Sequence, residues 1–294
     1  MGKYNMSKKD FLFLILLNTI WGSAFAVSGY TMLFFSPLFL YAIRFFLTGL
    51  ATVPFNIFPK KAIKKIFILS TLQTVIFCGV SLGIKNLDSA ISAILIKLDI
   101  PFTMILASIF LKEKLTKQML VGIFICFSAI YFLSENISFY NLKFILILIL
   151  SSLVTGFSNV YIKSIKEANN NQIVSWSCIF IGVEMFLVSL FFENTFILKD
   201  INIKVILIVL YLSIVSGYLA YLILYYLLKK YETSKIMPYN FLRPIIAIFA
   251  GYFILNEEIT LNKILGCLMI LIGIYITENK TNLYEKIKNI FIKK

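Results

Sequence analysis

Ten long apolar runs occupy more than two thirds of this 294-residue chain. A helix needs about 20 mostly apolar residues to cross the hydrocarbon core of a bilayer. In lipid, backbone polar groups need partners within their own segment, and these runs lack the alternation of barrel strands. We therefore predict an all-α integral membrane protein with ten transmembrane helices, over residues 11–33, 37–58, 66–86, 89–111, 118–134, 143–163, 172–192, 204–228, 235–255 and 260–277.

Composition excludes several classes of protein. Hydrophobic residues make up 60% of the chain and charged residues 14%, whereas soluble domains carry about 25% charged residues, so a water-soluble enzyme is excluded. The chain has no histidine, which removes the most common general base and metal ligand. Its four cysteines are far apart in apolar runs, and no P-loop motif is present. We expect no enzyme activity, no metal, no cofactor and no direct drive by ATP.

The basic residues predict the orientation of the chain. If the N-terminus is cytoplasmic, 20 of the 28 lysines and arginines fall in cytoplasmic segments and five on the opposite side. This bias predicts a multi-pass protein of the cell (inner) membrane with both termini in the cytoplasm. It also accounts for the net charge of +14 through contact with anionic lipid of the inner leaflet, without nucleic acid. Residues 279–294 are expected to form a basic cytoplasmic tail.

The two halves of the sequence resemble each other at an offset of 144 residues. Residues 111–116 align with residues 255–260, which places Glu113 on Glu257, and Gly122 then falls on Gly266. Five predicted spans therefore precede five similar spans. Because five is an odd number, the second copy must enter the membrane upside down. We predict an inverted repeat of residues 10–134 and 141–278.

Several short motifs resemble the drug/metabolite transporter superfamily, closest to its ten-helix branch with two EamA repeats. They are Trp21-Gly22-Ser23, Arg44-Phe45, and Leu-x-Glu-x-(Leu/Ile)-Thr around both Glu113 and Glu257. The second copy departs from the pattern, with Val154-Thr155-Gly156 in the place of Trp-Gly-Ser. The resemblance implies a 5+5 helical bundle around a central cavity. Members of this superfamily mostly move amino acids, metabolites or drugs, and relatives carry nucleotide sugars or sugar phosphates.

Ionisable side chains at membrane depth are costly, so they indicate either function or a structural pair. Asp99 and Arg243 each stand within two residues of a repeat-related proline, Pro101 or Pro244, and we expect both near the middle of the membrane, where they can pair directly. Lys97 lies on another helical face, and its partner is left open between Glu184 and the surroundings of Arg44. The set at this depth is Arg44, Lys97, Asp99, Glu184 and Arg243.

The candidate binding residues come from three of the predicted spans. Pro238 and Pro244 remove two backbone donors and free carbonyl groups around residues 239–243, as is tolerated where a helix lines a cavity. Asn18 and Trp21 share a helical face and offer a polar group beside an aromatic surface. We predict substrate contacts from Asn18, Trp21, Lys97, Asp99, Tyr239, Asn240 and Arg243. Structural or coupling roles are predicted for Arg44, Glu184, Glu113 and Glu257.

These residues favour a secondary transporter that moves an amino acid or similar zwitterion by alternating access. Arg243 and Lys97 suit a carboxylate or phosphate, and Asp99 suits an amino group. The alternative is a nucleotide-sugar or organophosphate exchanger, which would need more cations than the three at membrane depth. A channel or another non-transport membrane protein is a further alternative. Coupling to a proton at Asp99 or Glu184, exchange with a counter-substrate and facilitated diffusion are left open as modes of transport.

Overall fold

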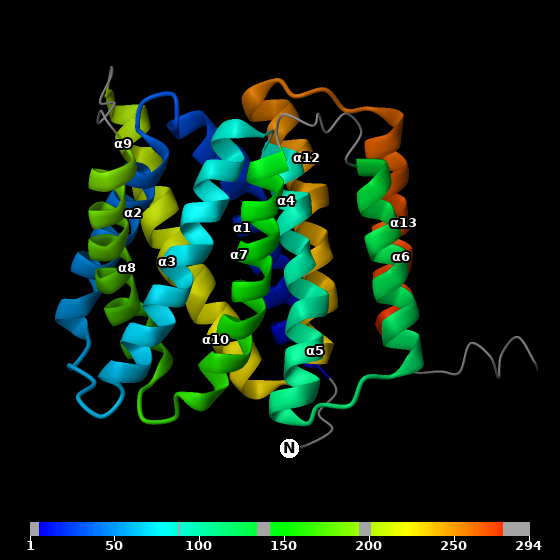
Figure 1. The fold of residues 1–294 in the computed structure, drawn as a ribbon, viewed down its shortest axis with the longest axis horizontal. Helices are drawn as coiled ribbons and strands as arrows, with labels where there is room; N and C mark the ends of the chain where they lie inside the picture. The colour runs from blue at the N-terminus through cyan, green and yellow to red at the C-terminus, as the bar shows by residue number, and fades with distance from the viewer. Residues whose placement is uncertain (1–5, 88, 134–141, 194–200, 279–294) are drawn as a thin grey trace, which may run out of the picture.

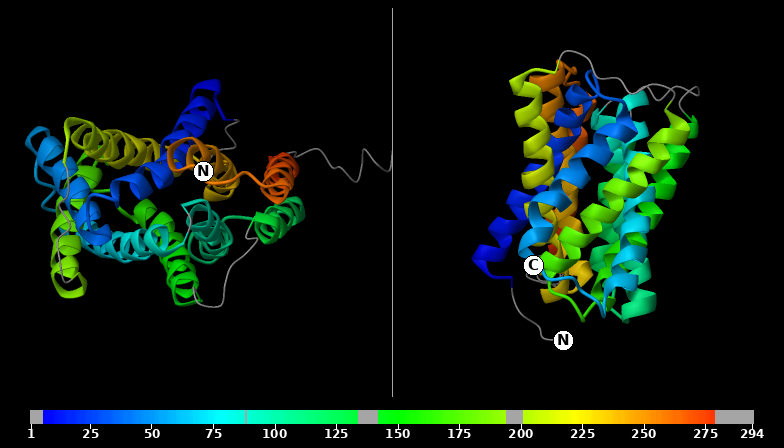
Figure 2. Two further views of the ribbon diagram at one scale, coloured as in Figure 1. Left: turned by 90° about the horizontal axis from the view of Figure 1, so that it is seen from above. Right: turned by 90° about the vertical axis from the view of Figure 1, so that its left-hand side faces the viewer.

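A computed structural model describes residues 6–87, 89–133, 142–193 and 201–278. Every regular element in these ranges is helical, and the long helices stand side by side in one bundle (Figures 1 and 2). The basic tail predicted for residues 279–294, and the junction predicted between the repeats near residues 134–141, lie outside the described residues.

The first half of the chain forms five helical segments, three of them continuous α-helices. They are α1 (Lys8–Thr31), α2 (Pro37–Thr52) continued by η1 (Val53–Phe55), α3 (Ile63–Asn86), the series α4 (Ser89–Leu95), η2 (Ile96–Leu98) and α5 (Asp99–Leu111), and α6 (Lys117–Leu133). The second half also forms five helical segments. The first two are α7 (Leu142–Tyr161) with η4 (Ile162–Ser164), and α8 (Asn170–Phe192). The third is the series α9 (Ile203–Leu210), η5 (Tyr211–Leu219) and α10 (Ala220–Lys230), the fourth is the series α11 (Thr233–Ile236), η6 (Met237–Phe241) and α12 (Leu242–Leu255), and the fifth is α13 (Leu261–Glu278).

Eight helical segments of the described chain are long and apolar enough to cross a membrane, and shorter apolar helices lie within α6 and α13. Large apolar side chains such as Phe124, Phe191 and Phe253 are exposed on the outside of the bundle, whereas Asn18 and Lys97 are fully buried. Exposed apolar surface on this scale needs lipid around it. The chain is therefore a multi-pass membrane protein, and the count of ten spans stays a prediction.

The helices pack in pairs that are distant in sequence. α1 lies along α12, α5 along α7, α3 between α7 and α8, and α2 along α8. α6 and α13 pack against each other at one edge of the bundle, as Figure 1 and the left view of Figure 2 show. Glycine permits the closest of these contacts: a Cβ atom on Gly22 would lie 2.7 Å from Ile246 Cβ, and one on Gly182 would lie 2.7 Å from Phe46 Cα.

Three of the membrane segments depart from a regular α-helix. The 3₁₀ turns η2 and η6 precede Pro101 and Pro244, which lack the amide hydrogen that would continue the helix. On α7, Ser152 Oγ lies 2.7 Å from Leu148 O of its own helix and 3.3 Å from the carbonyl oxygens of Leu95 and Ile96, so it packs beside the first interruption. The third departure is η5, a π-helix of nine residues, where the sequence had indicated only a regular span over residues 204–228.

Candidate functional site

The described helices enclose a cavity with about 880 Å³ of space between its wall atoms, part of it open to solvent. Its wall comes from four helices, α1, α2, α3 and α7, and from the three interrupted segments, through η2 and α5, η5 and α10, and η6 and α12. The charged wall residues are Arg44, Asp99 and Arg243, and the other polar and aromatic ones include Trp21, Tyr41, Gln73, Phe77, Asn159, Ser216, Tyr221, Tyr225 and Asn240.

Arg243 is held by residues from two helices. Its Nε donates to Asn18 Oδ1 over 3.0 Å, and its Nη2 donates to Asn240 Oδ1 over 2.9 Å. The guanidinium carbon lies 4.2 Å from the centre of the Trp21 ring, within cation–π range. Asn18 is fully buried and donates through Nδ2 to Leu14 O, which fixes its amide oxygen toward the arginine. The structure thus brings together four predicted site residues, with Asn18 behind the wall and the other three on it.

Asp99 and Lys97 form an ion pair beside the cavity. Lys97 Nζ lies 3.3 Å from Asp99 Oδ1, with the side chains 1% and 3% exposed. Asp99 reaches the cavity wall, but Lys97 lies behind it, so Lys97 is not placed where a substrate contact was predicted. The sequence had indicated that Asp99 could pair with Arg243 and had left the partner of Lys97 open, and the structure pairs the two residues with each other. Side chains two apart on an α-helix do not face each other, and the 3₁₀ turn η2 changes that relation.

Arg44 connects α2 to the π-helix η5. Its Nη2 lies 3.3 Å from Leu212 O and 3.2 Å from Ser216 Oγ, and its guanidinium carbon lies 4.7 Å from the centre of the Tyr41 ring. Trp21 Nε1 donates to Ser216 O over 3.0 Å. A π-helix redirects carbonyl groups, and such segments are frequent at functional sites. The carbonyls of η5 thus orient two cavity side chains, one from each of α1 and α2.

Two buried polar atoms of the wall have no hydrogen-bond partner among the described residues. They are Arg44 Nε and Gln73 Oε1, while Gln73 Nε2 donates to Tyr225 OH over 2.8 Å. Buried polar atoms are normally paired, so an unused donor and an unused acceptor at a cavity suit a ligand. Tyr41 and Ser216 were absent from our sequence-based site. Tyr41 precedes Arg44 by one helical turn, which is a usable signal, but no sequence pattern marks the π-helix.

Two other predicted residues lie away from the cavity wall. The Tyr239 ring packs edge-on against Phe11 of α1, with ring centres 5.8 Å apart, so its predicted substrate contact has no support in this arrangement. Glu184 lies between α3 and α8, where its carboxylate meets the hydroxyls of Ser70, Thr71 and Thr74.

Glu113 and Glu257 hold the starts of the interrupted helices. The residue before each has a left-handed backbone, with φ of 56° at Lys112 and 55° at Asn256. Glu113 Oε2 accepts from the backbone N–H of Ser234, next to the start of α11. Glu257 Oε1 accepts from the N–H and the hydroxyl of Ser89 at the start of α4, over 3.3 and 2.6 Å. Each glutamate therefore ties the segment after the fourth span of its own half to a helix of the other half.

Glu113 also has a basic partner. Lys163 Nζ lies 2.7 Å from its Oε1, and Thr233 Oγ1 donates to the same oxygen over 3.1 Å. Burial works to raise the pKa of the Glu113 carboxyl, but the hydrogen bond and charge of Lys163, with the bonds from Thr233 and Ser234, leave that pKa below its ordinary value. Glu113 is thus held as an anion that caps a helix and binds a lysine.

The sequence and the fold were compared with known proteins. A relative from Archaeoglobus fulgidus, named an uncharacterized transporter, is 28% identical over 278 residues, which are 92% of this chain and 99% of that protein. A relative from Escherichia coli, named a probable amino-acid metabolite efflux pump, is 26% identical over 92% of this chain and 95% of its own. One solved protein structure shares the fold, with a TM-score of 0.75 over 93% of this chain and 97% of the other at 11% identity.

The model of the EamA-like transporter family matches this chain twice, over residues 9–135 and 142–278. Together the two matches cover most of the sequence, and they confirm the family resemblance of its short motifs. The multi-pass helical bundle and the named relatives agree with that assignment. The chain belongs to the EamA-like transporter family.

Proposed function

We propose that this protein is a secondary transporter that moves an amino acid or a similar zwitterion across the cytoplasmic membrane by alternating access. The observation that carries the proposal is a cavity wall with both signs of charge, from Arg44, Arg243 and Asp99. A carboxylate would take the unused Nε of Arg44, and an ammonium group would bind Asp99 and the unused Gln73 Oε1. The named activity of the Escherichia coli relative supports the same class of substrate.

A phosphorylated substrate fits this wall less well. The charge of Lys97 is balanced by Asp99, and Arg243 already donates to Asn18 and Asn240. A phosphate monoester carries about −1.5 to −2 charges and three acceptor oxygens at neutral pH. Arg44 Nε is a buried N–H without a partner, and Arg243 has further N–H groups, but the wall carries only two cations beside the anion Asp99. An organophosphate exchanger is therefore the second candidate, and it is an outcome of the test below.

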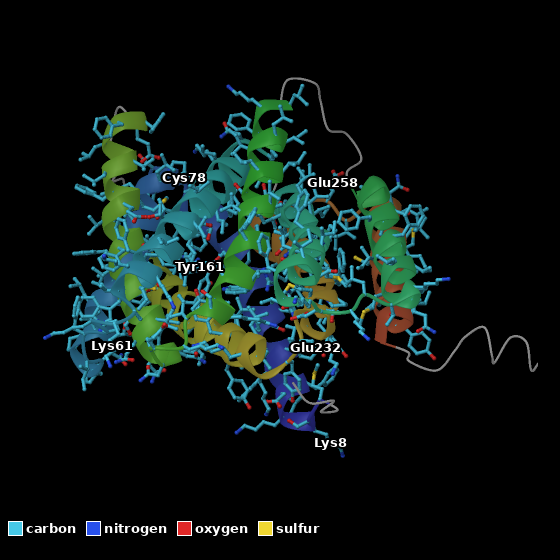
Figure 3. All side chains as sticks on the ribbon, turned by 60° about the horizontal axis from the view of Figure 1, so that its bottom comes forward. Lys8, Lys61, Cys78, Tyr161, Glu232 and Glu258 are labelled. Carbon is cyan, nitrogen blue, oxygen red and sulfur yellow. The ribbon has the colours of Figure 1, made fainter. Side chains whose placement is uncertain are left out.

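The proposed mechanism needs two five-helix halves in opposite orientations, with both termini in the cytoplasm. The double match to the family model supports the repeat. The helix contacts support the repeat as well. When each helix is replaced by its counterpart in the other half, the α1–α12 contact becomes the α7–α5 contact, and the α3–α7 contact becomes the α10–α1 contact. The α2–α8 and α6–α13 contacts are unchanged by this exchange. Lys8, Lys61 and Glu232 lie toward one end of the bundle and Glu258 toward the other (Figure 3).

The orientation can be tested with a membrane-impermeant maleimide on intact cells. Single-cysteine variants of a cysteine-free protein would carry Lys61→Cys at one end or Lys204→Cys at the other. We expect labelling of the second variant in intact cells and of the first only after the cells are opened. The reverse pattern would contradict the proposed orientation.

The substrate class can be tested by counterflow in vesicles that contain the purified protein. The panel would contain neutral amino acids, dicarboxylates and sugar phosphates. We expect saturable counterflow with amino acids, and a loss of about tenfold or more in uptake efficiency for Arg44→Gln and Asp99→Asn, because a hydrogen bond to a charged group contributes about 1.5–3 kcal/mol. Lys65→Gln is the control, because Lys65 pairs with Glu167 at the surface. Counterflow with phosphates alone would favour the exchanger, and flux without saturation would indicate a channel.

A further inference from the structure

The interface between α3 and α8 holds a carboxyl group outside the cavity. Glu184 is half-buried near the middle of α8, and three hydroxyl groups of α3 surround it. Thr74 Oγ1 lies 2.5 Å from its Oε2, and Thr71 Oγ1 and Ser70 Oγ lie 3.0 and 3.3 Å from its Oε1. Because α3 and α8 both belong to predicted spans, this group lies at membrane depth.

Glu184 has no basic partner in the described part of the chain. None of the five ion pairs found there includes it. The titratable groups on the neighbouring helices have other contacts. Arg44 of α2 binds η5, and Tyr225 of α10 binds Gln73. Glu193 at the end of α8 binds the start of α2, Cys78 of α3 contacts Met185, and Cys178 is buried on α8. Asp99, the other carboxyl group at this depth in the predicted set, has Lys97.

The surroundings of Glu184 are hydrocarbon-like. On α8, Val183 and Leu187 are exposed beside it, and on α3 Phe67 and Val75 are exposed on the same side as Thr71. These side chains face lipid when the bundle is in a membrane. An ionised carboxylate that faces hydrocarbon without a counter-charge is costly, and such a group takes up a proton instead.

Counting hydrogens shows that this site can hold the acid with or without its proton. A hydroxyl has one hydrogen to donate. Ser70 Oγ lies 2.7 Å from Phe67 O, closer than to Glu184, and Thr71 Oγ1 lies 3.1 Å from the same carbonyl. When both hydroxyls donate to Phe67 O, one of their oxygens can accept the single hydrogen of a protonated Oε1, while Oε2 accepts from Thr74. When the proton leaves, Thr71 can turn to donate to the carboxylate, so the site accommodates both states.

We propose that Glu184, with the hydroxyls of Ser70, Thr71 and Thr74, is a proton-binding site in the membrane interior, and that its proton is the coupling ion of transport. The first half of the proposal is independent of the substrate, and the second half rests on the proposed function. On release, the O–H bond of the acid breaks, its electron pair stays on the carboxylate and the proton passes to water.

Two features connect the site to the cavity and to motion. α3 carries Gln73 and Phe77 into the cavity wall, next in sequence to the hydroxyls that hold Glu184 or one turn away from them. α3 and α8 also belong to different halves of the chain, so a movement of one half against the other changes this interface. Apolar contacts close it on both sides, between Phe67 and Phe180 and between Cys78, labelled in Figure 3, and Met185. Proton exchange then requires these contacts to open.

The proton site can be tested by labelling the full-length protein in lipid vesicles with dicyclohexylcarbodiimide, which reacts with protonated carboxyl groups in apolar surroundings. Peptide mass mapping would measure the adduct at Glu184 between neutral and alkaline pH. We expect an adduct near neutrality whose rate of formation falls with rising pH, approaching about tenfold per pH unit once the acid is mostly ionised. Glu184→Gln removes the adduct, and Glu193→Gln, a change at the end of the same helix, keeps it.

Three outcomes would overturn the proton site. They are no adduct at any pH in a folded protein, an adduct formed at the same rate at every pH, and suppression of the adduct by Na⁺ at constant pH, which would assign the site to a metal cation. Thr74→Val is a second variant, which keeps the acid and removes one hydroxyl. We expect it to retain the adduct and to shift the pH at which labelling falls.

Coupling has a separate readout. With the counterflow substrate in hand, a pH-sensitive dye inside the vesicles reports proton movement during net uptake. We expect Glu184→Gln to keep counterflow exchange and to lose both the proton signal and accumulation driven by a pH gradient. An unchanged proton signal in this variant would overturn the coupling assignment. Absence of counterflow with every substrate class, together with pH-dependent labelling of Glu184, would instead count against the proposed function and leave the proton site supported.

Discussion

Replacement of Glu113 by glutamine is expected to lower the free energy of unfolding by about 2–3 kcal/mol. The carboxylate accepts from Lys163 Nζ, Thr233 Oγ1 and Ser234 N, over 2.7, 3.1 and 3.2 Å. The side chains of Glu113 and Lys163 are 8% and 12% exposed, so water does not replace the lost charge. A hydrogen bond to a charged group contributes about 1.5–3 kcal/mol and a neutral one about 0.5–1.5. The glutamine side chain keeps a neutral oxygen that accepts hydrogen bonds, but it leaves Lys163 without its counter-charge.

The assay is thermal unfolding of the purified protein in detergent. One kcal/mol corresponds to about 2–4 °C in Tm for a chain of 150–250 residues, so we expect Glu113→Gln to lower Tm by about 4–12 °C. Glu257→Gln is the matched control, since its carboxylate contacts Ser89 and has no ion pair among the described residues. Glu257→Gln should lower Tm by less than half as much as Glu113→Gln does. Lys163→Met should lower Tm by less when Glu113→Gln is already present than it does in the natural protein.

The same pair predicts a dependence on pH. The pKa of Glu113 is lower in the folded protein than its ordinary value of 4.5. The stabilisation from its charge is therefore complete above pH 4.5 and is lost as the pH falls through the folded pKa. The difference in Tm between the natural protein and Glu113→Gln should shrink over that acidic range. A difference that is the same at neutral and acidic pH, or equal effects for Glu113→Gln and Glu257→Gln, would refute this reasoning.

Three further predictions concern the cavity and its helices. Gly22→Ala should destabilise the protein by about 1–3 kcal/mol in thermal unfolding, because the new Cβ atom would lie 2.7 Å from Ile246 Cβ, whereas Gly29→Ala on the same helix meets its nearest atom at 3.2 Å and should cost less. Trp21→Phe keeps a ring beneath Arg243 and loses the Nε1 bond to η5, so we expect weaker substrate binding with retained folding, measured by counterflow and Tm. Arg44→Lys keeps the charge and loses the planar fork, and we expect transport efficiency to fall about tenfold.

Much of the architecture could be predicted from the order of residues. Apolar runs of membrane length predicted helices, and the structure has apolar helical segments at all ten positions, eight of them long enough to span a bilayer by themselves. The prolines at positions 238 and 244 predicted an interruption around residues 239–243, which is present as η6, whereas the interruption η2 close to Pro101 was not predicted. Such signals are local, because the hydropathy of a run and the missing amide hydrogen of proline act within one or two turns.

The candidate site was predicted in part. Trp21, Asn240 and Arg243 lie together on the cavity wall. Asn240 and Arg243 were chosen as polar groups beside a break in the helix, and Trp21 as an aromatic surface beside Asn18. The partners of the charges could not be predicted. Lys97 turns to Asp99 because η2 is a 3₁₀ turn, and a reading based on a regular helix places these side chains on different faces.

By itself, the sequence determined that this chain belongs in a membrane and where one of its helices breaks, and it predicted two similar sets of helices. Only the tertiary structure decided that Arg44 binds a carbonyl and a hydroxyl of a π-helix, that Glu113 caps a helix of the other half, and that Glu184 meets three hydroxyls of α3. The physical reason is range. Hydropathy and proline act along the chain, whereas charge pairing depends on which helices touch, and these partners lie more than 100 residues apart.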